Sequence, residues 1–84
     1  MYYKSPCLIF RMEIQARVAA RIREIRTKKQ LTQEALAWAS DVDRTFMNHV
    51  ENGRRNISLK SLEKIVVGGL EMSMQEFFND EIFA

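Results

Sequence analysis

The sequence is poor in cysteine, proline and glycine, and each shortage excludes a class of structure. The single cysteine, Cys7, rules out an internal disulfide bond and a multi-cysteine metal site. The scarcity of cysteine fits a reducing compartment, and we expect the protein to act in the cytoplasm. One proline and three glycines in 84 residues favour helices over a turn-rich β-sandwich.

Long apolar runs are also missing. No apolar stretch approaches the roughly 20 residues that a membrane-spanning helix needs, so no membrane partner is expected. The apolar patch in MYYKSPCLIFRM is short and lacks a small-residue cleavage site, which argues against a signal peptide. Pro6 argues against a continuous helix there. We expect residues 1–12 to be an N-terminal extension, either a dispensable one before an alternative start at Met12 or an arm that packs on the domain.

Basic residues are absent from one end of the chain. Residues 65–84 hold four acids and no base, whereas residues 1–64 hold all 13 Lys and Arg residues beside seven acids. The basic part could face a polyanion while the acidic tail points away or meets another protein. An ordinary solvated surface would explain the charge equally well. At this size residues 13–84 form one small domain, whose marginal core favours oligomerisation.

Apolar periodicity and capping signals predict an all-α fold. Four candidate N-caps each follow an apolar residue and precede another by four positions, the pattern of a hydrophobic staple. The caps are Thr32, Asp43, Ser58 and Ser73, with Glu76 completing a capping box. The five predicted helices span residues 13–29, 33–40, 44–51, 59–69 and 74–82. Gly68 and Gly69 are expected to end the fourth helix as a C-terminal cap.

Apolar positions at helical spacing predict which faces are buried. In the first helix they are Ile14, Val18, Ile22 and Ile25, and in the fourth they are Leu59, Leu62, Ile65 and Val66. Trp38 is expected to serve packing rather than function.

The third predicted helix, residues 44–51, has two distinct faces at 100° per residue. The polar face holds Arg44, Thr45, Asn48, His49 and Asn52, and the apolar face holds Phe46, Met47 and Val50. Arg, Thr, Asn and His are side chains that hydrogen-bond base edges, and Arg54 and Arg55 follow at once as phosphate partners. The pattern therefore favours binding to double-stranded DNA.

Residues 32–63 resemble the lambda-repressor-like (XRE) helix-turn-helix family. The resemblance rests on TQEALA and on VDRTFMNHVENGRRNISLKSLEKI, while DRT and GRRN resemble the controller proteins of restriction–modification systems. It implies a five-helix domain over residues 13–78 and a dimeric transcriptional regulator that binds operators upstream of its own gene and the endonuclease gene. Asp41 replaces the usual glycine and would need a left-handed backbone. Ile57 replaces a common proline, and the chain is one residue longer near Gly68 and Gly69.

The resemblance assigns base-reading roles to Arg44, Thr45, Asn48, His49 and Arg55. Arg44 could bond guanine bidentately, and Thr45 could touch a thymine methyl group. Asn48 could read adenine or hold a phosphate. The alternatives are an ion pair for Arg44, a solvated amide for Asn48 and an exposed spectator for His49. As the only histidine, His49 does not suggest a metal site.

Phosphate contacts are expected from Gln33, Lys28, Arg54 and Asn56. Gln33 opens the second helix, where its amide and nearby backbone N–H groups could hold a phosphate, or it could be an ordinary polar first-turn residue. Lys28 sits in the last turn of the first predicted helix, next to the expected DNA-facing unit. Glu51 is expected to pair with a neighbouring arginine and to be structural.

The last helix carries more apolar side chains than five small helices can bury. Phe77, Phe78, Ile82 and Phe83 are therefore predicted to form a homodimer interface, with simple core packing as the alternative. A two-fold dimer would set two recognition helices about 34 Å apart and bind a pseudo-palindromic operator.

The sequence bears on three classes of function. A sequence-specific regulator is favoured, with RNA polymerase as a further candidate partner. The alternatives are an antitoxin-type interaction module of the same fold and a general repressor of the family. An enzyme is not supported, because the sequence offers no phosphate loop, metal cluster or catalytic Cys/His pairing, and no cofactor is expected.

Overall fold

The computed structural model describes residues 13–84, and no strand occurs among them. Three helices near the start of this range are α2 (Ile14–Lys28), α3 (Gln33–Ser40) and α4 (Arg44–Glu51). The helix α5 (Leu59–Glu63) runs directly into a π-helical segment, η1 (Lys64–Gly69). The short α6 (Met74–Phe78) and the 3-10 turn η2 (Glu81–Phe83) complete the chain. The predicted all-α class is confirmed, while the predicted extension at residues 1–12 lies outside the described range.

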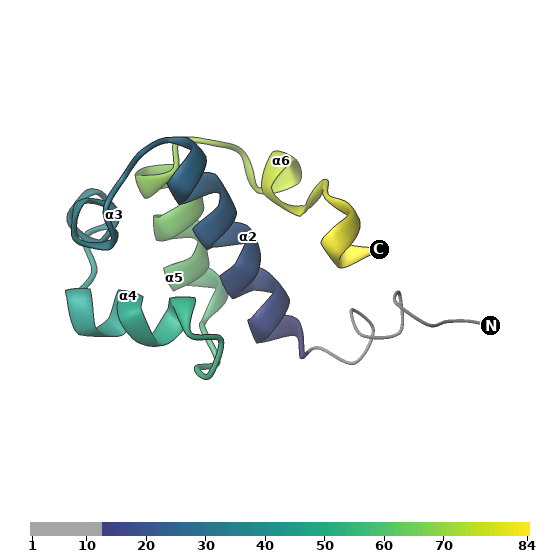
Figure 1. Cartoon of the computed structure of the whole chain (residues 1–84), viewed down its shortest axis with the longest axis horizontal. Helices are drawn as coiled ribbons and strands as arrows, with labels where there is room; N and C mark the ends of the chain where they lie inside the picture. The colour runs from purple at the N-terminus through teal and green to yellow at the C-terminus, as the bar shows by residue number, and fades with distance from the viewer. Residues whose placement is uncertain (1–12) are drawn as a thin grey trace.

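The helices pack around a shared apolar core, with α2 between α3 and α4 on one side and α6 on the other (Figure 1). The helix α3 packs on η1 and α4, and α4 also packs on α2. The helix α6 and the C-terminus lie on the opposite side of α2 from α3 and α4 (Figure 1). The main apolar core cluster draws on every α-helix, on η1 and on Leu70 directly after it: Val18, Ile22, Ile25, Leu36, Ala37, Met47, Val50, Leu62, Ile65, Val66, Leu70 and Phe77.

All four predicted N-caps are confirmed by hydrogen bonds. The side chains of Thr32, Asp43 and Ser58 accept from the backbone N–H groups of Ala35, Thr45 and Ser61, respectively. Ser73 accepts from the Glu76 N–H, and the Glu76 carboxylate accepts from the Ser73 N–H, which completes the predicted capping box. Each cap satisfies an otherwise unpaired donor at a helix start and so fixes where the helix begins.

The fourth helix differs from the prediction in its last turn. It ends at Gly69 as expected, but residues 64–69 are π-helical, and the N–H of Leu70 donates to Ile65 O at 2.8 Å. A π-turn accommodates more residues than an α-turn, so the end of this helix is wider than a regular α-helical turn would be. Neither glycine supplies a left-handed cap, since the left-handed residue beyond the helix is Glu71, with φ 57°.

Gly69 is needed for close packing instead. A Cβ atom at this position would overlap the Ser40 hydroxyl and lie 2.7 Å from Leu36 Cδ1. The absence of a side chain therefore lets η1 approach α3 directly.

Three apolar residues depart from the predicted burial. Ile14 and Leu59, at the starts of their helices, are 51% and 80% exposed. Trp38 is 86% exposed, so its expected packing role is wrong. Ile14 and Leu59 are each the first residue of their helix, one turn before the first buried residue of that helix, Val18 in α2 and Leu62 in α5.

The C-terminal segment is fastened by Arg21, a residue to which the sequence analysis gave no role. Its Nε donates to Phe77 O at 2.8 Å, and its Nη2 donates to Glu76 O at 3.0 Å. Its Nη1 lies 3.2 Å from Asp80 Oδ2. One arginine thus satisfies carbonyl groups at the end of α6 and holds the acidic tail against α2.

Candidate nucleic-acid interface

A tight turn joins α3 to α4. Asp41 adopts the predicted left-handed conformation, with φ 57° and ψ 46°, and ends α3. The N–H of Val42 then donates to Ala37 O at 3.0 Å, and Asp43 caps α4. The turn sets α4 across the end of α3, which is the arrangement of a helix-turn-helix (Figure 1).

The two faces of α4 agree with the sequence analysis. Met47 and Val50 are buried in the core, and Phe46 is half-buried. The exposed residues are Arg44, Thr45, Asn48, His49 and Asn52. The helix therefore presents a row of hydrogen-bonding side chains to solvent while its other side fixes it to the domain.

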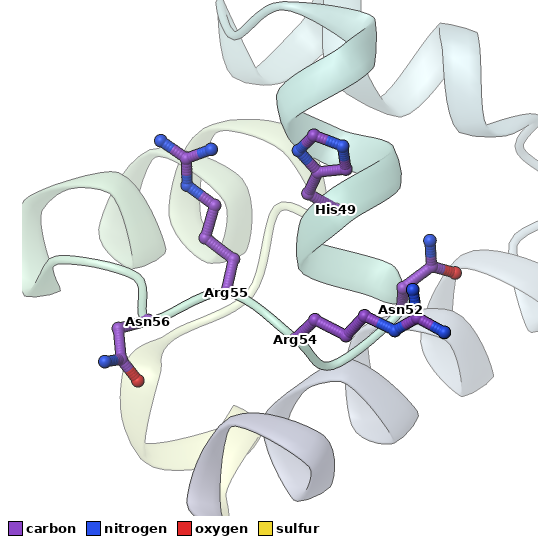
Figure 2. Close-up of a pocket in the computed structure, with 5 residues that line it drawn as sticks. All are labelled: His49, Asn52, Arg54, Arg55 and Asn56. Atoms are coloured by element: carbon purple, nitrogen blue, oxygen red, sulfur yellow. The ribbon is translucent and has the colours of Figure 1, made fainter.

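Beyond α4 the chain forms an open basin of about 500 Å³ (Figure 2). It is lined by His49, Asn52, Arg54, Arg55 and Asn56. Gly53, with φ 72°, allows the turn that brings the loop back beside α4. The basin is cationic and rich in donors, which suits the phosphate groups at the edge of a groove.

Arg55 is supported by an aromatic ring. Its Cζ atom lies 5.2 Å from the ring centroid of Phe46, within the range of a cation–π contact. Figure 2 shows His49 and Arg55 extending from the helix and the loop toward the same side of the basin. Two residues predicted to read bases are thus brought together although six positions separate them.

A second, smaller hollow of about 210 Å³ lies at the start of α4. Its lining consists of Gln33, Arg44, Thr45 and Asn48. Gln33, the first residue of α3, therefore lines the same hollow as three residues of α4 that are predicted to contact bases. Lys28 lies apart from both hollows and pairs with Glu24 at 3.5 Å on an exposed surface.

A buried ion pair lies beneath this surface. Arg26 Nε donates to Glu51 Oε2 at 2.7 Å, and Arg26 Nη2 donates to Glu51 Oε1 at 3.0 Å. The side chain of Glu51 is only 3% exposed. Its predicted pairing with an arginine is confirmed, and the structure identifies the partner as Arg26. Asn52, which the sequence placed on the polar face without a specific contact, lines the basin.

The four residues predicted to form a dimer interface differ in how far their side chains are exposed to solvent. Phe77 is fully buried in the core of its own protomer, so its side chain does not face a second copy. Phe78 is 38% exposed, and Ile82 and Phe83 are half-buried. The three phenylalanine rings contact one another, with Phe77 and Phe78 edge-to-face and Phe83 tilted against both; the centroids of Phe78 and Phe83 are 4.8 Å apart.

Phe78 also lines an apolar groove of about 330 Å³. The other lining residues are Ile14, Gln15, Val18, Asn56, Ile57, Leu59 and Leu62. The groove collects the exposed apolar ends of α2, α5 and α6. Its edge at Asn56 adjoins the basin, so the apolar and the cationic surfaces share one loop.

None of the helices in residues 13–84 is long and apolar enough to cross a membrane. Within the same range no group of three or more His, Cys, Asp or Glu side chains is placed to hold a metal ion.

Comparison with known proteins identifies close relatives. Residues 22–67 match the Helix-turn-helix family model. The control protein C.MunI of Mycoplasma sp is 41% identical over 69 residues, which cover 81% of this chain and 92% of that protein. The control protein C.BamHI of Bacillus amyloliquefaciens is 44% identical over 46 residues, covering 54% of this chain and 57% of that protein.

Solved structures extend the likeness to three dimensions. The wild-type restriction–modification controller protein C.Esp1396I is 44% identical, with a TM-score of 0.72 over 76% of this chain and 83% of that chain. Another structure, with the same scores, contains the C.Esp1396I tetramer in complex with its natural 35 base-pair operator.

Proposed function

Because the chain belongs to the helix-turn-helix family, among the restriction–modification controller proteins, we propose that it regulates transcription by binding operator DNA. The observation that carries this proposal is the exposed polar face of α4, which continues into the cationic basin. Such a surface supplies both base contacts and phosphate contacts, and a specific DNA-binding protein needs both. We propose that the protein is a regulator without catalytic activity. We also propose that it acts in the cytoplasm, where an operator would be found.

Arg44 and Thr45, at the N-terminal end of α4, would enter the major groove first. Arg44 is exposed and forms no ion pair in the described residues, so its guanidinium is available for a guanine edge. We assign further base contacts to Asn48, His49 and Arg55.

Phosphate contacts would flank the base contacts. Arg54 and Asn56 line the basin beyond α4, and Gln33 stands at the start of α3. These positions lie on either side of the recognition helix and could bridge the two backbones of a groove. Lys28 is the more peripheral candidate, because Glu24 is close to its ammonium group.

We propose that the apolar groove beside Phe78 is covered by a second copy of the chain. Three exposed apolar side chains, Ile14, Leu59 and Phe78, line this groove together. Monomeric domains seldom expose such a contiguous apolar patch. A two-fold dimer would present two α4 helices about 34 Å apart, matching the two halves of a pseudo-palindrome. Bound next to a promoter, it could also contact RNA polymerase.

The proposal is tested by titrating the full chain against labelled duplexes and recording fluorescence anisotropy. One duplex comes from upstream of the protein's own gene, and the other has the same composition in scrambled order. The expected result is binding at least about a thousandfold tighter to the upstream duplex. Equal affinity for both duplexes would contradict a specific regulatory role.

A further inference from the structure

Side-chain amides form a continuous chain of hydrogen bonds across the candidate DNA-binding face. Gln33 Nε2 donates to Glu51 Oε1 at 3.2 Å. Asn48 Nδ2 donates to Gln33 Oε1 at 3.1 Å, and Asn52 Nδ2 donates to Asn48 Oδ1 at 3.2 Å. This series of hydrogen bonds therefore begins at the buried carboxylate of Glu51 and ends at the exposed amide of Asn52, the C-cap residue of α4.

The carboxylate of Glu51 sets the direction of this chain. An ionised carboxylate only accepts hydrogen bonds, so the group of Gln33 that meets it must be the NH2. The oxygen of Gln33 then faces α4 and can only receive a donor, which fixes the NH2 of Asn48 toward it. The oxygen of Asn48 is turned toward Asn52 in the same way.

The carboxylate itself is held in place. Arg26 binds both of its oxygens, and the backbone carbonyl of Glu51 accepts from Arg23 Nη2. With a side chain only 3% exposed, Glu51 is too deeply placed to touch DNA. Its influence on the surface must pass through Gln33.

We propose that Glu51 and Gln33 are positioning residues that make Gln33, Asn48 and Asn52 contact DNA as one oriented unit. The proposal rests on the DNA-binding function proposed above. It changes the role of Gln33, which was expected to hold a phosphate or to be an ordinary polar residue of the first turn. It also changes Asn48 from an independent reader into one whose amide is oriented before DNA arrives.

This orientation decides what the surface offers to a duplex. Asn48 uses one N–H on Gln33 and keeps the other for an acceptor such as guanine N7 or O6, adenine N7 or a phosphate oxygen. A freely rotating asparagine would offer donor and acceptor equally. Preorganisation also lowers the entropy lost when the side chains become ordered on DNA.

The first arm of the test uses the protein without DNA. Side-chain NH2 resonances are recorded by 15N–1H NMR for the full chain and for Gln33→Met, which keeps the length of the side chain and removes its amide. The resonances of Asn48 and Asn52 should both move, while those of Asn79 on the far side of the domain should stay. In Asn48→Ala the Gln33 resonance should move in turn. Unmoved Asn48 and Asn52 signals in Gln33→Met would overturn the proposal.

The second arm is a double-mutant cycle on operator binding. Gln33→Met and Asn48→Ala should each weaken binding about tenfold, and the double variant should also weaken it about tenfold. Independent contacts would instead give about a hundredfold loss in the double variant, which would contradict a single unit. The absence of any loss in both single variants would contradict it as well. Gln75→Met, on the exposed surface of α6, is the matched control and should bind as the unaltered chain does.

The two arms separate the failure of this inference from failure of the proposed function. If the unaltered chain did not bind DNA, the proposed function would be wrong, while the NMR result would still report whether the amides are coupled. If the chain bound DNA and the variants acted additively, the function would stand and the oriented unit would not.

Discussion

Arg26 and Glu51 join α2 to the end of α4 through two parallel hydrogen bonds of 2.7 and 3.0 Å. Their side chains are 17% and 3% exposed, so the pair lies largely out of water. A bidentate pair of this kind allows little rotation or sliding between the elements it joins. The C-terminal end of α4, just before the basin, is therefore fixed to α2, the longest helix among the described residues.

Removing one partner of this pair should be costly. Glu51→Ala leaves the Arg26 guanidinium largely buried without its counter-ion and should lower the free energy of unfolding by about 3–5 kcal/mol. Urea denaturation followed by circular dichroism measures the change. Glu63→Ala, at an exposed glutamate, is the control and should change stability by less than about 0.5 kcal/mol. Equal losses in the two variants would show that the buried pair contributes nothing special.

The two neighbouring glycines of η1 should respond oppositely to alanine. In Gly69→Ala the new methyl group would overlap Ser40 and meet Leu36 at 2.7 Å, so a loss of about 1–3 kcal/mol is expected. In Gly68→Ala the nearest atom is Ala39 O at 3.8 Å. That variant should be neutral or gain up to about 1 kcal/mol from helix propensity. Thermal unfolding measures the change in stability of both variants. A Gly69→Ala variant more stable than the unaltered chain would refute the close packing of η1 on α3.

Arg44→Ala tests base reading. The substitution should cost about 1–3 kcal/mol of binding to the operator and relax the preference at one base pair. Binding is measured on the operator and on a set of operators with single base-pair changes. A uniform loss on every sequence would mean that Arg44 holds the backbone rather than a base.

Arg54→Ala tests phosphate contact. Because Arg54 lies in the cationic basin, its loss should weaken binding to all sequences alike and reduce the slope of log K against log salt by about one. Titrations at four or more salt concentrations give the slope. If the slope did not change, Arg54 would not be a phosphate ligand.

Leu59→Asp tests the dimer surface. Leu59 is 80% exposed at the first position of α5, where an acidic residue is compatible with the helix dipole, so the protomer should stay folded. A charge in the apolar groove should raise the dimer dissociation constant at least about tenfold, measured by sedimentation. Trp38→Asp removes an even more exposed apolar residue outside the groove and should leave association unchanged. If only Trp38→Asp disrupted the dimer, the interface would lie on α3.

Local features of the fold were predictable because they depend on neighbours in sequence. The caps at Thr32, Asp43, Ser58 and Ser73 require only a side-chain oxygen and an N–H two or three residues away. The polar and apolar faces of α4 follow from helical spacing alone. The left-handed conformation of Asp41 was also predictable, because Asp41 stands at the turn position where the family usually has glycine.

Features that depend on distant partners were not predictable. Arg21 meets Phe77 across 56 positions, and Arg26 meets Glu51 across 25, so nothing in the local pattern distinguishes them from other arginines of α2. Burial of Phe77 and exposure of Trp38 were misjudged for a related reason. Both residues are apolar on short helices, and only the tertiary arrangement decides which of them meets the core.

The central claim is that α4 presents its polar face to a duplex. It is tested most directly by selecting bound duplexes from a random pool with the full chain and sequencing them. The account predicts an enriched pseudo-palindrome whose half-sites are separated by about one helical turn of DNA. A pool that remained random at low salt, after repeated selection, would contradict it.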